Sequence, residues 1–449
     1  MSLSVGLASV RADKRLFILP ALFFLSPFVT AAVPRLTWLF VASIAIAAGV
    51  RAWRQGVAWR SLVPLDAVSI AAVLAAAYVS VSALWAADSG AGLAKAALLW
   101  GLVLLTIAAS RAIATLDERQ LRLAALGFAA GVALGAIYVL FEMLSGAAIT
   151  RWAMNAIPAF RPDKFKHIEL SRMGLVKKIS LSELNQNVTI VMLSLWPALS
   201  VLALVANRPR RTLLLTLLFV ITALAVLLSE HQSSQIALVL SLPTFLLAWK
   251  WRTAVIRTLA ALWCLAFALV LPVDFAAYNA GWHMVPWLPN SARARIILWE
   301  YTAEHVLEQP WLGIGVDSTH SLNRKGQFDQ PQGFIFPRSS GEHAHDVFLQ
   351  IWYELGVVGA ILLALAGAAI ALRMLRLPQD IQPFAAASFA AFFGIAAFAW
   401  SMWQAWFMCA IGLLIFYVCI AAYAPREHAI PEAGHHALGF RRAEGVWCN

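Results

Sequence analysis

The sequence predicts an all-α integral membrane protein, and three observations support that class: the composition, the spacing of the apolar runs and the placement of the cations. Of 449 residues, 61% are hydrophobic and 13% are charged, whereas a soluble domain has roughly 45–50% apolar and about 25% charged residues. A core surrounded by water cannot bury this excess of apolar side chains. We therefore expect most of the chain to lie within a lipid bilayer.

Apolar runs that approach the ~20 residues needed to cross a bilayer as a helix recur along the chain. They lie at Phe17–Val33, Leu36–Val50, Leu65–Trp85, Leu93–Ala109, Leu123–Leu144, Val188–Ala206, Leu213–Leu228, Ile236–Trp249, Ala254–Val273, Val347–Leu372, Phe384–Trp400 and Trp406–Tyr423. The first run follows three cations, as in a signal peptide, but the comparable runs after it favour an uncleaved first span. The sequence therefore predicts about twelve transmembrane helices.

Cationic residues cluster in alternate loops between the runs, and the positive-inside rule assigns those loops to the cytoplasm. The clusters are Arg11/Lys14/Arg15, Arg51/Arg54/Arg60, Arg111/Arg119/Arg122, Arg208/Arg210/Arg211, Lys250/Arg252/Arg257 and Arg373/Arg376. Because the cations are dispersed in this way, the net charge of +11 indicates topology rather than a nucleic-acid-binding face. Both termini are therefore expected on the cytoplasmic side.

The same alternation places two longer polar segments, residues 145–187 and 274–345, on the outer side of the membrane. Both are rich in Trp, Phe, Pro and Arg rather than in the residues typical of disorder, and we expect short amphipathic helices in them at the membrane surface. The predicted order is N-terminal transmembrane helices (1–144), a basic outer loop (145–187), central transmembrane helices (188–273), a large outer loop (274–345), C-terminal transmembrane helices (346–423) and a cytoplasmic tail (424–449).

A histidine stands where the large outer loop becomes a membrane helix. If that helix begins near Asp346, its period places His345 on one stripe with Leu349, Trp352, Gly356 and Gly359. The two glycines would let another helix or a lipid chain approach closely. Neutral imidazole accepts a proton near neutral pH, so His345 is a candidate general base. The alternative is a capping or interfacial histidine.

Two further groups accompany this histidine. His343 is expected to position a ligand or to be solvated. Glu354 lies roughly opposite His345 on the helix and shares a face with Gln350, so it should tie the helix to a neighbour rather than contact the histidine. Insertion of an ionisable group at this depth costs roughly 2.5–3.5 kcal/mol, which makes Glu354 and Glu142 functional candidates.

The large outer loop contains Arg295 and Trp299, which are four residues apart and therefore share one helix face. Guanidinium is always charged and binds phosphate oxygens in a bidentate manner, so Arg295 is a candidate clamp for a diphosphate. For Arg295, and for Arg293 beside it, the alternative is a snorkelling side chain or a lipid headgroup contact.

The smaller outer loop carries many cations on a face that is usually poor in them. They are Arg151, Arg161, Lys164, Lys166, His167, Arg172, Lys177 and Lys178. Attraction for an anionic outer-leaflet molecule, such as a phosphorylated lipid-linked sugar, would explain this exception. Ordinary headgroup binding is the alternative.

Metal and nucleotide chemistry have no support in the sequence. Three of the four cysteines lie in apolar runs and Cys448 lies in the tail, so neither a disulfide framework nor a CxxC metal site is present. No carboxylate pair suited to a metal and no phosphate-cradling glycine loop occurs. We expect no cofactor, so the energy of any reaction must come from an activated donor.

The stretch from His345 to Gly359 resembles the signature of the O-antigen ligase and polymerase superfamily: a histidine, a polar residue, nine residues and then Gly-x-x-Gly. Asp346 departs from it, because relatives usually carry an amide or a hydroxyl there. Arg295 and Trp299, followed by the segment from Pro310 to Gly315, resemble a second superfamily motif. In the polar turn at 229–235, a glutamine replaces the arginine that relatives often have.

The resemblance implies a glycosyltransferase with a GT-C-like fold that takes its glycan from a polyprenyl diphosphate. Within the superfamily we favour an O-antigen ligase, which moves O-antigen from undecaprenyl diphosphate to lipid A–core at the periplasmic face of a Gram-negative inner membrane. The alternatives are an O-antigen polymerase and, from another class, a transporter or flippase of lipid-linked glycan. The predicted partners are the lipid-linked O-antigen, lipid A–core and membrane lipids, without nucleic acid.

Residue roles also follow from the resemblance. His345 and Arg295 are the predicted catalytic residues. The candidate binding residues for the diphosphate and the glycan lipid are Arg161, Arg172, Arg293, Arg338, His343 and Glu354.

Overall fold

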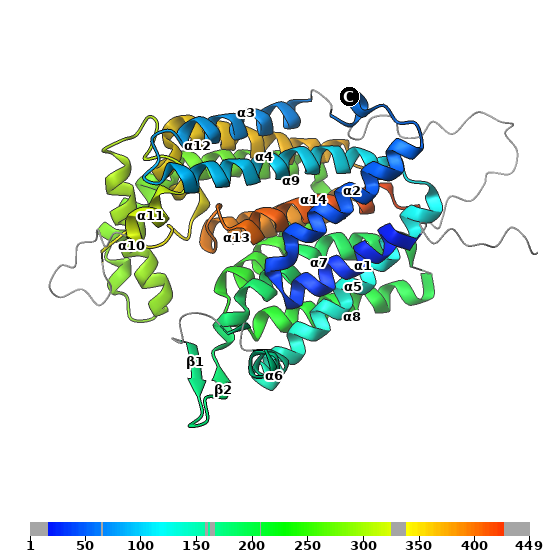
Figure 1. Ribbon diagram of the computed structural model, residues 1–449, viewed down its shortest axis with the longest axis horizontal. Helices are drawn as coiled ribbons and strands as arrows, with labels where there is room; N and C mark the ends of the chain where they lie inside the picture. The colour runs from blue at the N-terminus through cyan, green and yellow to red at the C-terminus, as the bar shows by residue number, and fades with distance from the viewer. Residues whose placement is uncertain are drawn as a thin grey trace, which may run out of the picture. The chain divides into compact units, whose positions relative to one another are not determined.

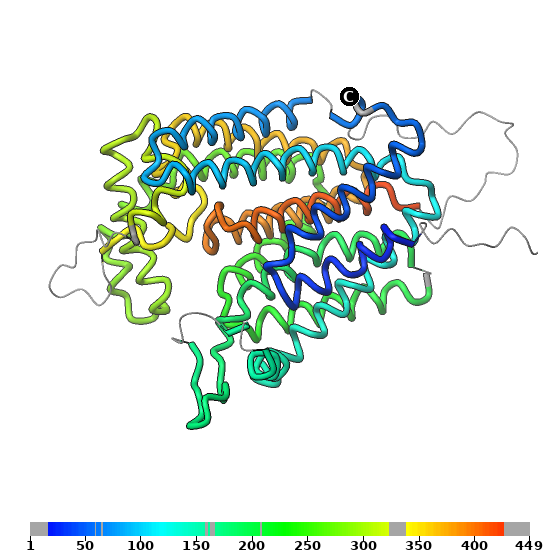
Figure 2. Tube along the Cα trace, in the orientation of Figure 1, coloured from blue at the N-terminus to red at the C-terminus, as the bar shows by residue number. Residues whose placement is uncertain are grey.

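The computed structural model describes residues 17–63, 66–157, 160–161, 167–206, 208–324 and 338–425. Within this part of the chain nearly all regular structure is helical, as Figures 1 and 2 show. The predicted all-α class is therefore confirmed. The predicted tail after Ala424 lies almost wholly outside the described residues, as do Lys164 and Lys166.

The chain forms two compact units. The first comprises the described parts of Met1–Leu62, Ala108–Leu238 and Leu413–Cys448, and the second comprises those of Val63–Ile107 and Val239–Gly412. The first contains α1 (Ile18–Ala32), η2 (Pro34–Leu36), α2 (Thr37–Arg54), η3 (Trp59–Leu62), α5 (Glu118–Ser145), α6 (Ala148–Ala156), η6 (Leu181–Leu184), α7 (Asn185–Val205) and α8 (Arg208–Leu227).

The second unit contains α3 (Ala67–Ser82), η7 (Trp282–Met284), α10 (Asn290–Val306), α11 (Ser318–Arg324), α12 (Val347–Arg373), η8 (Met374–Arg376) and α13 (Gln382–Phe398). Three helices, α4 (Ser89–Ala114), α9 (Gln232–Asn279) and α14 (Ala405–Tyr423), contribute residues to both units.

In the part of the chain that the structure describes, each predicted apolar run overlaps a helix. Among the described residues, eight helices are long and apolar enough to cross a membrane and three more are apolar but shorter. The 48-residue helix α9 holds two predicted runs, which meet at Trp251, where the backbone is not helical (φ −122°, ψ 47°). A multi-pass membrane protein is therefore supported, while the number of spans and the GT-C-like arrangement stay predictions.

The first unit is held together by a close contact between α1 and α5, which run side by side in Figure 1. Gly127, Gly131 and Gly135 recur every fourth residue on α5 and face α1. A Cβ atom added to Gly131 would lie 2.1 Å from the carbonyl oxygen of Phe24. This stripe of small residues lets the two backbones meet, as is typical of helix pairs in membranes.

Glu142, one of the two intramembrane carboxylates singled out in the sequence, has a structural environment. Its carboxylate accepts hydrogen bonds from the backbone amides of Ile149 and Thr150 at 2.8 and 3.0 Å. These amides belong to the first turn of α6, where amides have no partner within the helix. Glu142 therefore fixes α6 to the end of α5.

The smaller outer loop differs in part from the prediction. It does contain the short helix α6, but it also contains a two-stranded antiparallel sheet, β1 (Ile168–Leu170) and β2 (Val176–Ile179), which the expectation of helices alone missed. Ile168, Val176 and Ile179 are buried while the charged residues between them are exposed. The turn at Gly174, with a positive φ of 71°, joins the strands. Alternating residues around a glycine turn are the signal for such a hairpin.

The second unit is organised around α12, against which α3 packs (Figure 1). The helix begins at Val347, and the Asp346 carboxylate caps it by accepting hydrogen bonds from the amides of Phe348 and Leu349 at 2.7 and 3.0 Å. The predicted start near Asp346 is thus confirmed. Aromatic rings from α9 pack against this first turn, with the Phe267 and Phe348 ring centroids 4.9 Å apart.

The predicted continuous stripe from His345 to Gly359 is wrong. The backbone of α12 leaves the helical conformation at Gly356 (φ 62°, ψ −164°), which interrupts the helical period. A Cβ atom on Gly359 would meet only its own helix, at Leu355. The close approach expected at Gly356 does occur, but a loop makes it rather than a helix or a lipid chain.

Candidate active site

His345 directly precedes Asp346, the N-cap of α12, and its backbone is left-handed (φ 56°). Residues other than glycine adopt this conformation at a cost of about 1–3 kcal/mol, and such residues concentrate at functional sites. The half-buried ring places Nδ1 2.8 Å from the carbonyl oxygen of Ala399. Because a carbonyl only accepts, Nδ1 carries the proton and Nε2 has the lone pair. His345 is therefore fixed as the tautomer that a general base requires.

His343 lies against this ring, with the two imidazole centroids 4.0 Å apart. The backbone amide of His345 donates to Nδ1 of His343 at 3.1 Å, so that nitrogen is unprotonated. His343 thereby fixes the backbone that holds the catalytic candidate. The sequence predicted a positioning residue here, and the contact supports that role toward His345 itself.

Arg295 comes to the same place from α10. Burial, and then the nearby charge of Arg295, lower the pKa of His345 to about 4. Burial, His345 and Arg295 together lower the pKa of His343 well below its usual value. Both rings are therefore neutral at pH 7. Within the described part of the chain the Arg295 guanidinium has no hydrogen bond and no ion pair, and burial lowers its pKa.

Trp299, one turn further along α10, connects that helix to the histidine loop. Its indole nitrogen donates to the carbonyl oxygen of Ala344 at 2.7 Å, between the two histidines. Arg295 and Trp299 thus share a helix face, as predicted, and that face meets the loop of His345. The structure brings together the two residues that the sequence singled out as catalytic.

The segment from Pro310 to Gly315 fills the break in α12. The carbonyl of Pro310 accepts from the amide of Val357 at 2.8 Å, and the amide of Gly315 donates to the carbonyl of Glu354 at 2.8 Å. Tyr78 adds a hydroxyl that donates to the carbonyl of Leu355 at 2.9 Å. The backbone groups freed by the break are in this way satisfied by protein, as a membrane environment requires.

This inserted segment needs glycines. A Cβ atom on Gly313 would lie 2.4 Å from the backbone of Glu354, and one on Gly356 would lie 2.4 Å from the backbone of Trp311. Both residues also have positive φ angles, 66° and 62°. The two sequence motifs are therefore parts of one structure, a broken helix and the loop that bridges it.

Glu354 of α12 binds the chain that follows the Pro310–Gly315 segment. Its buried carboxylate accepts hydrogen bonds from the amides of Asp317 and Thr319, at 2.9 and 3.2 Å, and from the indole of Trp403. Gln350, on the same helix face, donates to it at 3.3 Å. Glu354 thus ties α12 to its neighbours, as the helix wheel predicted. A role in binding the glycan lipid stays a prediction.

The remaining candidate arginines do not join the His345 cluster in the same way. Arg338 forms an ion pair with Glu300 at 2.9 Å and with Glu304 at 2.7 Å. Arg293 donates to the carbonyl oxygen of His283 at 2.8 Å. Arg161 and Arg172 belong to the first unit, where Arg161 donates to the carbonyl oxygen of Met154 at 3.0 Å and Arg172 is exposed in the hairpin turn.

Sequence reasoning missed Lys95, although it applied the same argument to Glu354. Lys95 lies within a predicted span, donates to the carbonyl oxygen of Trp403 at 2.9 Å and lies 3.8 Å from the carboxylate of Asp317. A cation inside an apolar run was the available signal. Among the described residues, no group of three or more His, Cys, Asp or Glu side chains is placed to hold a metal ion.

The described part of the chain is thus a helical membrane protein that places a neutral histidine and an arginine without a hydrogen bond or ion pair near the start of a broken helix. The family model described as O-Antigen ligase matches residues 217–364, a range that includes Arg295, His345 and Glu354. The match supports membership of the chain in the O-antigen ligase and polymerase superfamily and confirms the resemblance found in the sequence. No curated protein matches the chain.

Proposed function

We propose that this protein is an O-antigen ligase, an inverting glycosyltransferase that moves O-antigen from undecaprenyl diphosphate to lipid A–core at the periplasmic face of a Gram-negative inner membrane. The family match implies glycosyltransferase-like ligase or polymerase chemistry on lipid-linked glycans in general. The choice of the ligase reaction, of these two substrates and of a metal-independent mechanism is our inference.

The observation that carries the proposal is that His345 and Arg295 lie close enough together for the charge of Arg295 to lower the pKa of His345. Nε2 of His345 would take the proton of an acceptor hydroxyl while the hydroxyl oxygen attacks the anomeric carbon of the donor sugar. The bond from that carbon to the diphosphate breaks, and undecaprenyl diphosphate leaves with the electron pair. Attack from the side opposite the leaving group inverts the anomeric centre.

Arg295 would stabilise the charge that develops on the leaving diphosphate, where a fixed cation is most effective. Through Arg295, donor binding would also change the basicity of His345. Because its charge is one cause of the lowered pKa of His345, a bound diphosphate that offsets this charge would raise that pKa. The base then becomes stronger when the donor is in place. Arg161, Arg172, Arg293 and Arg338 are proposed as further contacts for the lipid-linked substrates.

The nearest alternative is an O-antigen polymerase, with the same chemistry and a different acceptor. A transporter or flippase is the alternative from another class, and the few charges within the spans speak against it. A lipopolysaccharide gel of a deletion strain separates ligase from polymerase, because loss of a ligase leaves lipid A–core without O-antigen and loss of a polymerase leaves core with a single unit. Transfer of glycan from lipid-linked donor to core by the purified protein separates both enzymes from a flippase.

The strain should be complemented with the wild-type gene and with a His345→Ala gene. We expect the first to restore O-antigen on core and the second to fail although the protein is present in the membrane. Core that carries one repeat unit in the deletion strain would replace the ligase proposal by the polymerase.

A further inference from the structure

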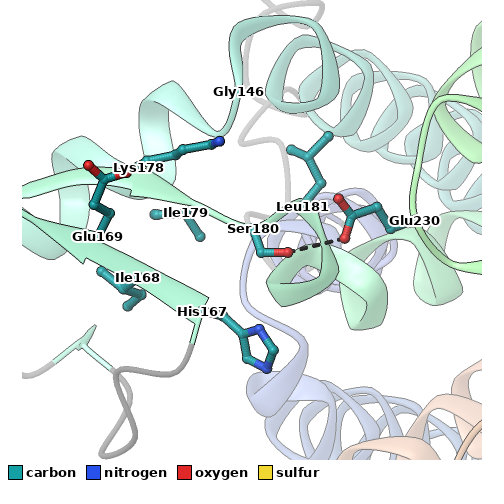
Figure 3. Close-up of a pocket in the computed structure, with 9 residues that line it drawn as sticks. All are labelled: Gly146, His167, Ile168, Glu169, Lys178, Ile179, Ser180, Leu181 and Glu230. Carbon is teal, nitrogen blue, oxygen red and sulfur yellow. Dashed lines mark hydrogen bonds between the residues drawn. The ribbon is translucent and has the colours of Figure 1, made fainter. Parts of the chain in front are cut away.

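A cavity of about 650 Å³ opens beside the β-hairpin of the first unit. Figure 3 shows its walls, which come from the two strands, from the segment that follows β2 and from the turn between α8 and α9. Glu169 and Lys178 are directly opposite each other in the strand register. Glu230 faces the hairpin from the turn. The cavity volume lies within the range of about 300–1,000 Å³ that is usual for small-molecule sites.

The walls of this hairpin cavity are fixed from both sides. Asn155 of α6 binds both backbone groups of Val176 in β2, accepting at 2.8 Å and donating at 3.2 Å. On the other side, the Ser180 hydroxyl donates to the Glu230 carboxylate at 3.1 Å, the bond drawn in Figure 3. A site with walls held in this way needs little rearrangement to bind a ligand.

The lining combines acceptors, a donor and apolar surface. Glu169 and Glu230 supply carboxylates, Lys178 supplies an ammonium group and His167 an imidazole. Of the apolar lining residues Leu181 is partly exposed, whereas Ile168 and Ile179 are buried. The two carboxylates make this cavity a poorer site for a phosphate group than the cations of the surrounding loop, and one of them, Glu169, also lies 3.7 Å from the ammonium group of Lys177. Carboxylates instead accept hydrogen bonds from hydroxyl groups, and charge-assisted bonds of this kind are strong.

We propose that the hairpin cavity binds a pyranose residue of a glycan, with hydroxyl groups donating to Glu230 and Glu169, Lys178 donating to a sugar oxygen and the carbon face of the ring on Leu181. The inference rests on the proposed function for the identity of the glycan, which is either the donor O-antigen or the acceptor core. An open cavity suits a chain that continues beyond the bound residue.

The test is saturation-transfer NMR on the purified full chain in detergent, titrated with two lipid-free saccharides released by mild acid from lipopolysaccharide. One is core oligosaccharide and the other is O-antigen polysaccharide, and the one that binds identifies the source. Glu230→Gln keeps an acceptor for Ser180 and removes the carboxylate charge, while Lys178→Ala removes the donor. Glu183→Gln, in η6 and outside the cavity lining, is the matched control.

We expect Glu230→Gln and Lys178→Ala to weaken saccharide binding at least about tenfold, as loss of a charged hydrogen bond does, while Glu183→Gln binds like the wild type. Failure of the wild type to bind either saccharide, or equal binding by all variants, overturns the proposal. Because the readout is binding without transfer, a failure of the ligase proposal in the deletion strain is a separate outcome.

Discussion

Two half-buried histidines of the second unit have nearly the same hydrogen bond and different surroundings. His305 in α10 has its Nδ1 2.8 Å from the carbonyl of Tyr301, four residues back on the same helix. His345 has its Nδ1 at the same distance from a carbonyl 54 residues away. Both hydrogen bonds fix the protonated nitrogen and leave Nε2 as the base. The tautomer alone therefore does not define a catalytic histidine.

The difference lies in what surrounds each ring. His305 lies against the ring of Tyr301, tilted by 36°, within regular helix. His345 instead has a left-handed backbone, a second histidine against it and the charge of Arg295 close enough to lower its pKa. A strained backbone is retained only where its surroundings over-determine it. The loop before α12 therefore holds a neutral imidazole beside Arg295, and in the proposed function this imidazole is the base.

The strongest test of this comparison replaces each histidine by alanine. His345→Ala should reduce single-turnover transfer by about 10²–10⁴-fold, the usual contribution of a general base, and should leave donor affinity unchanged. His305→Ala should retain turnover within a few-fold. The measurement is transfer from lipid-linked donor by protein that is monodisperse in detergent. Near wild-type transfer by His345→Ala would make that histidine structural.

Arg295 provides the second test, because it is the neighbour that His305 lacks. Arg295→Ala should reduce transfer by about 10²–10³-fold, as removal of a charge-stabilising group does, and should also weaken donor binding, since the diphosphate is already charged in the ground state. Arg295→Lys should restore only part of both, because an ammonium lacks the planar fork of guanidinium. The measurements are donor affinity and single-turnover rate. Unchanged donor affinity in Arg295→Ala would remove the clamp.

Much of this architecture could be predicted from local sequence. Apolar runs placed the helices, the carboxylate of Asp346 marked the start of α12, and the spacing of Arg295 and Trp299 placed both on one face. These features depend on residues a few positions apart, where helical periodicity is reliable. The position of Glu354 opposite His345, and its tie to neighbouring segments, also followed from the helix wheel.

The features that local sequence does not predict depend on contacts between residues far apart in the chain. A lone glycine such as Gly356 is tolerated within an apolar helix, so nothing local shows that the helix breaks there. Only the Pro310–Gly315 segment, which satisfies the freed backbone groups, makes the break possible. The pairing of Arg338 with Glu300 and Glu304 is likewise a meeting of segments more than 30 residues apart.

Alanine at Gly356 tests whether the bridged break supports the site. Gly356 and Gly281 both have positive φ angles, 62° and 74°, but an added Cβ meets the backbone of Trp311 at 2.4 Å in the first and nothing within 4 Å in the second. Alanine at Gly281 incurs about 1–2 kcal/mol of left-handed strain, and alanine at Gly356, whose ψ of −164° lies in a region that essentially only glycine adopts, incurs about 1–3 kcal/mol. Gly356→Ala should lose about 1–3 kcal/mol more by overpacking, seen as a lower thermal midpoint in detergent. Equal thermal midpoints for the two variants would show that the Pro310–Gly315 segment can move to accommodate the added methyl group.

Asp346→Asn should give the smallest effect, and it tests the residue that caps α12. Asparagine still caps α12, because its side-chain oxygen can accept from the amides of Phe348 and Leu349. Burial raises the pKa of Asp346 from 3.8 to about 7, so the folded state binds a proton that the unfolded state releases between these values. Its contribution to stability is therefore full below pH 4 and is lost as pH rises to about 7.

His345 has the opposite slope in nearly the same window, because its pKa falls from 6.5 to about 4 on folding and the unfolded chain then binds the extra proton. The two contributions offset each other in the wild type. Asp346→Asn removes one of them, so its free energy of unfolding relative to the wild type should rise steadily from pH 4 to pH 7 and then level off, by an amount on the order of 1–3 kcal/mol. Its thermal midpoint should rise with it. The measurement is intrinsic tryptophan fluorescence during heating across this pH range. A stability difference that does not change with pH would mean that folding leaves the pKa of Asp346 unchanged. The Asp346 carboxylate would then be ionised at pH 7, next to His345 in the chain.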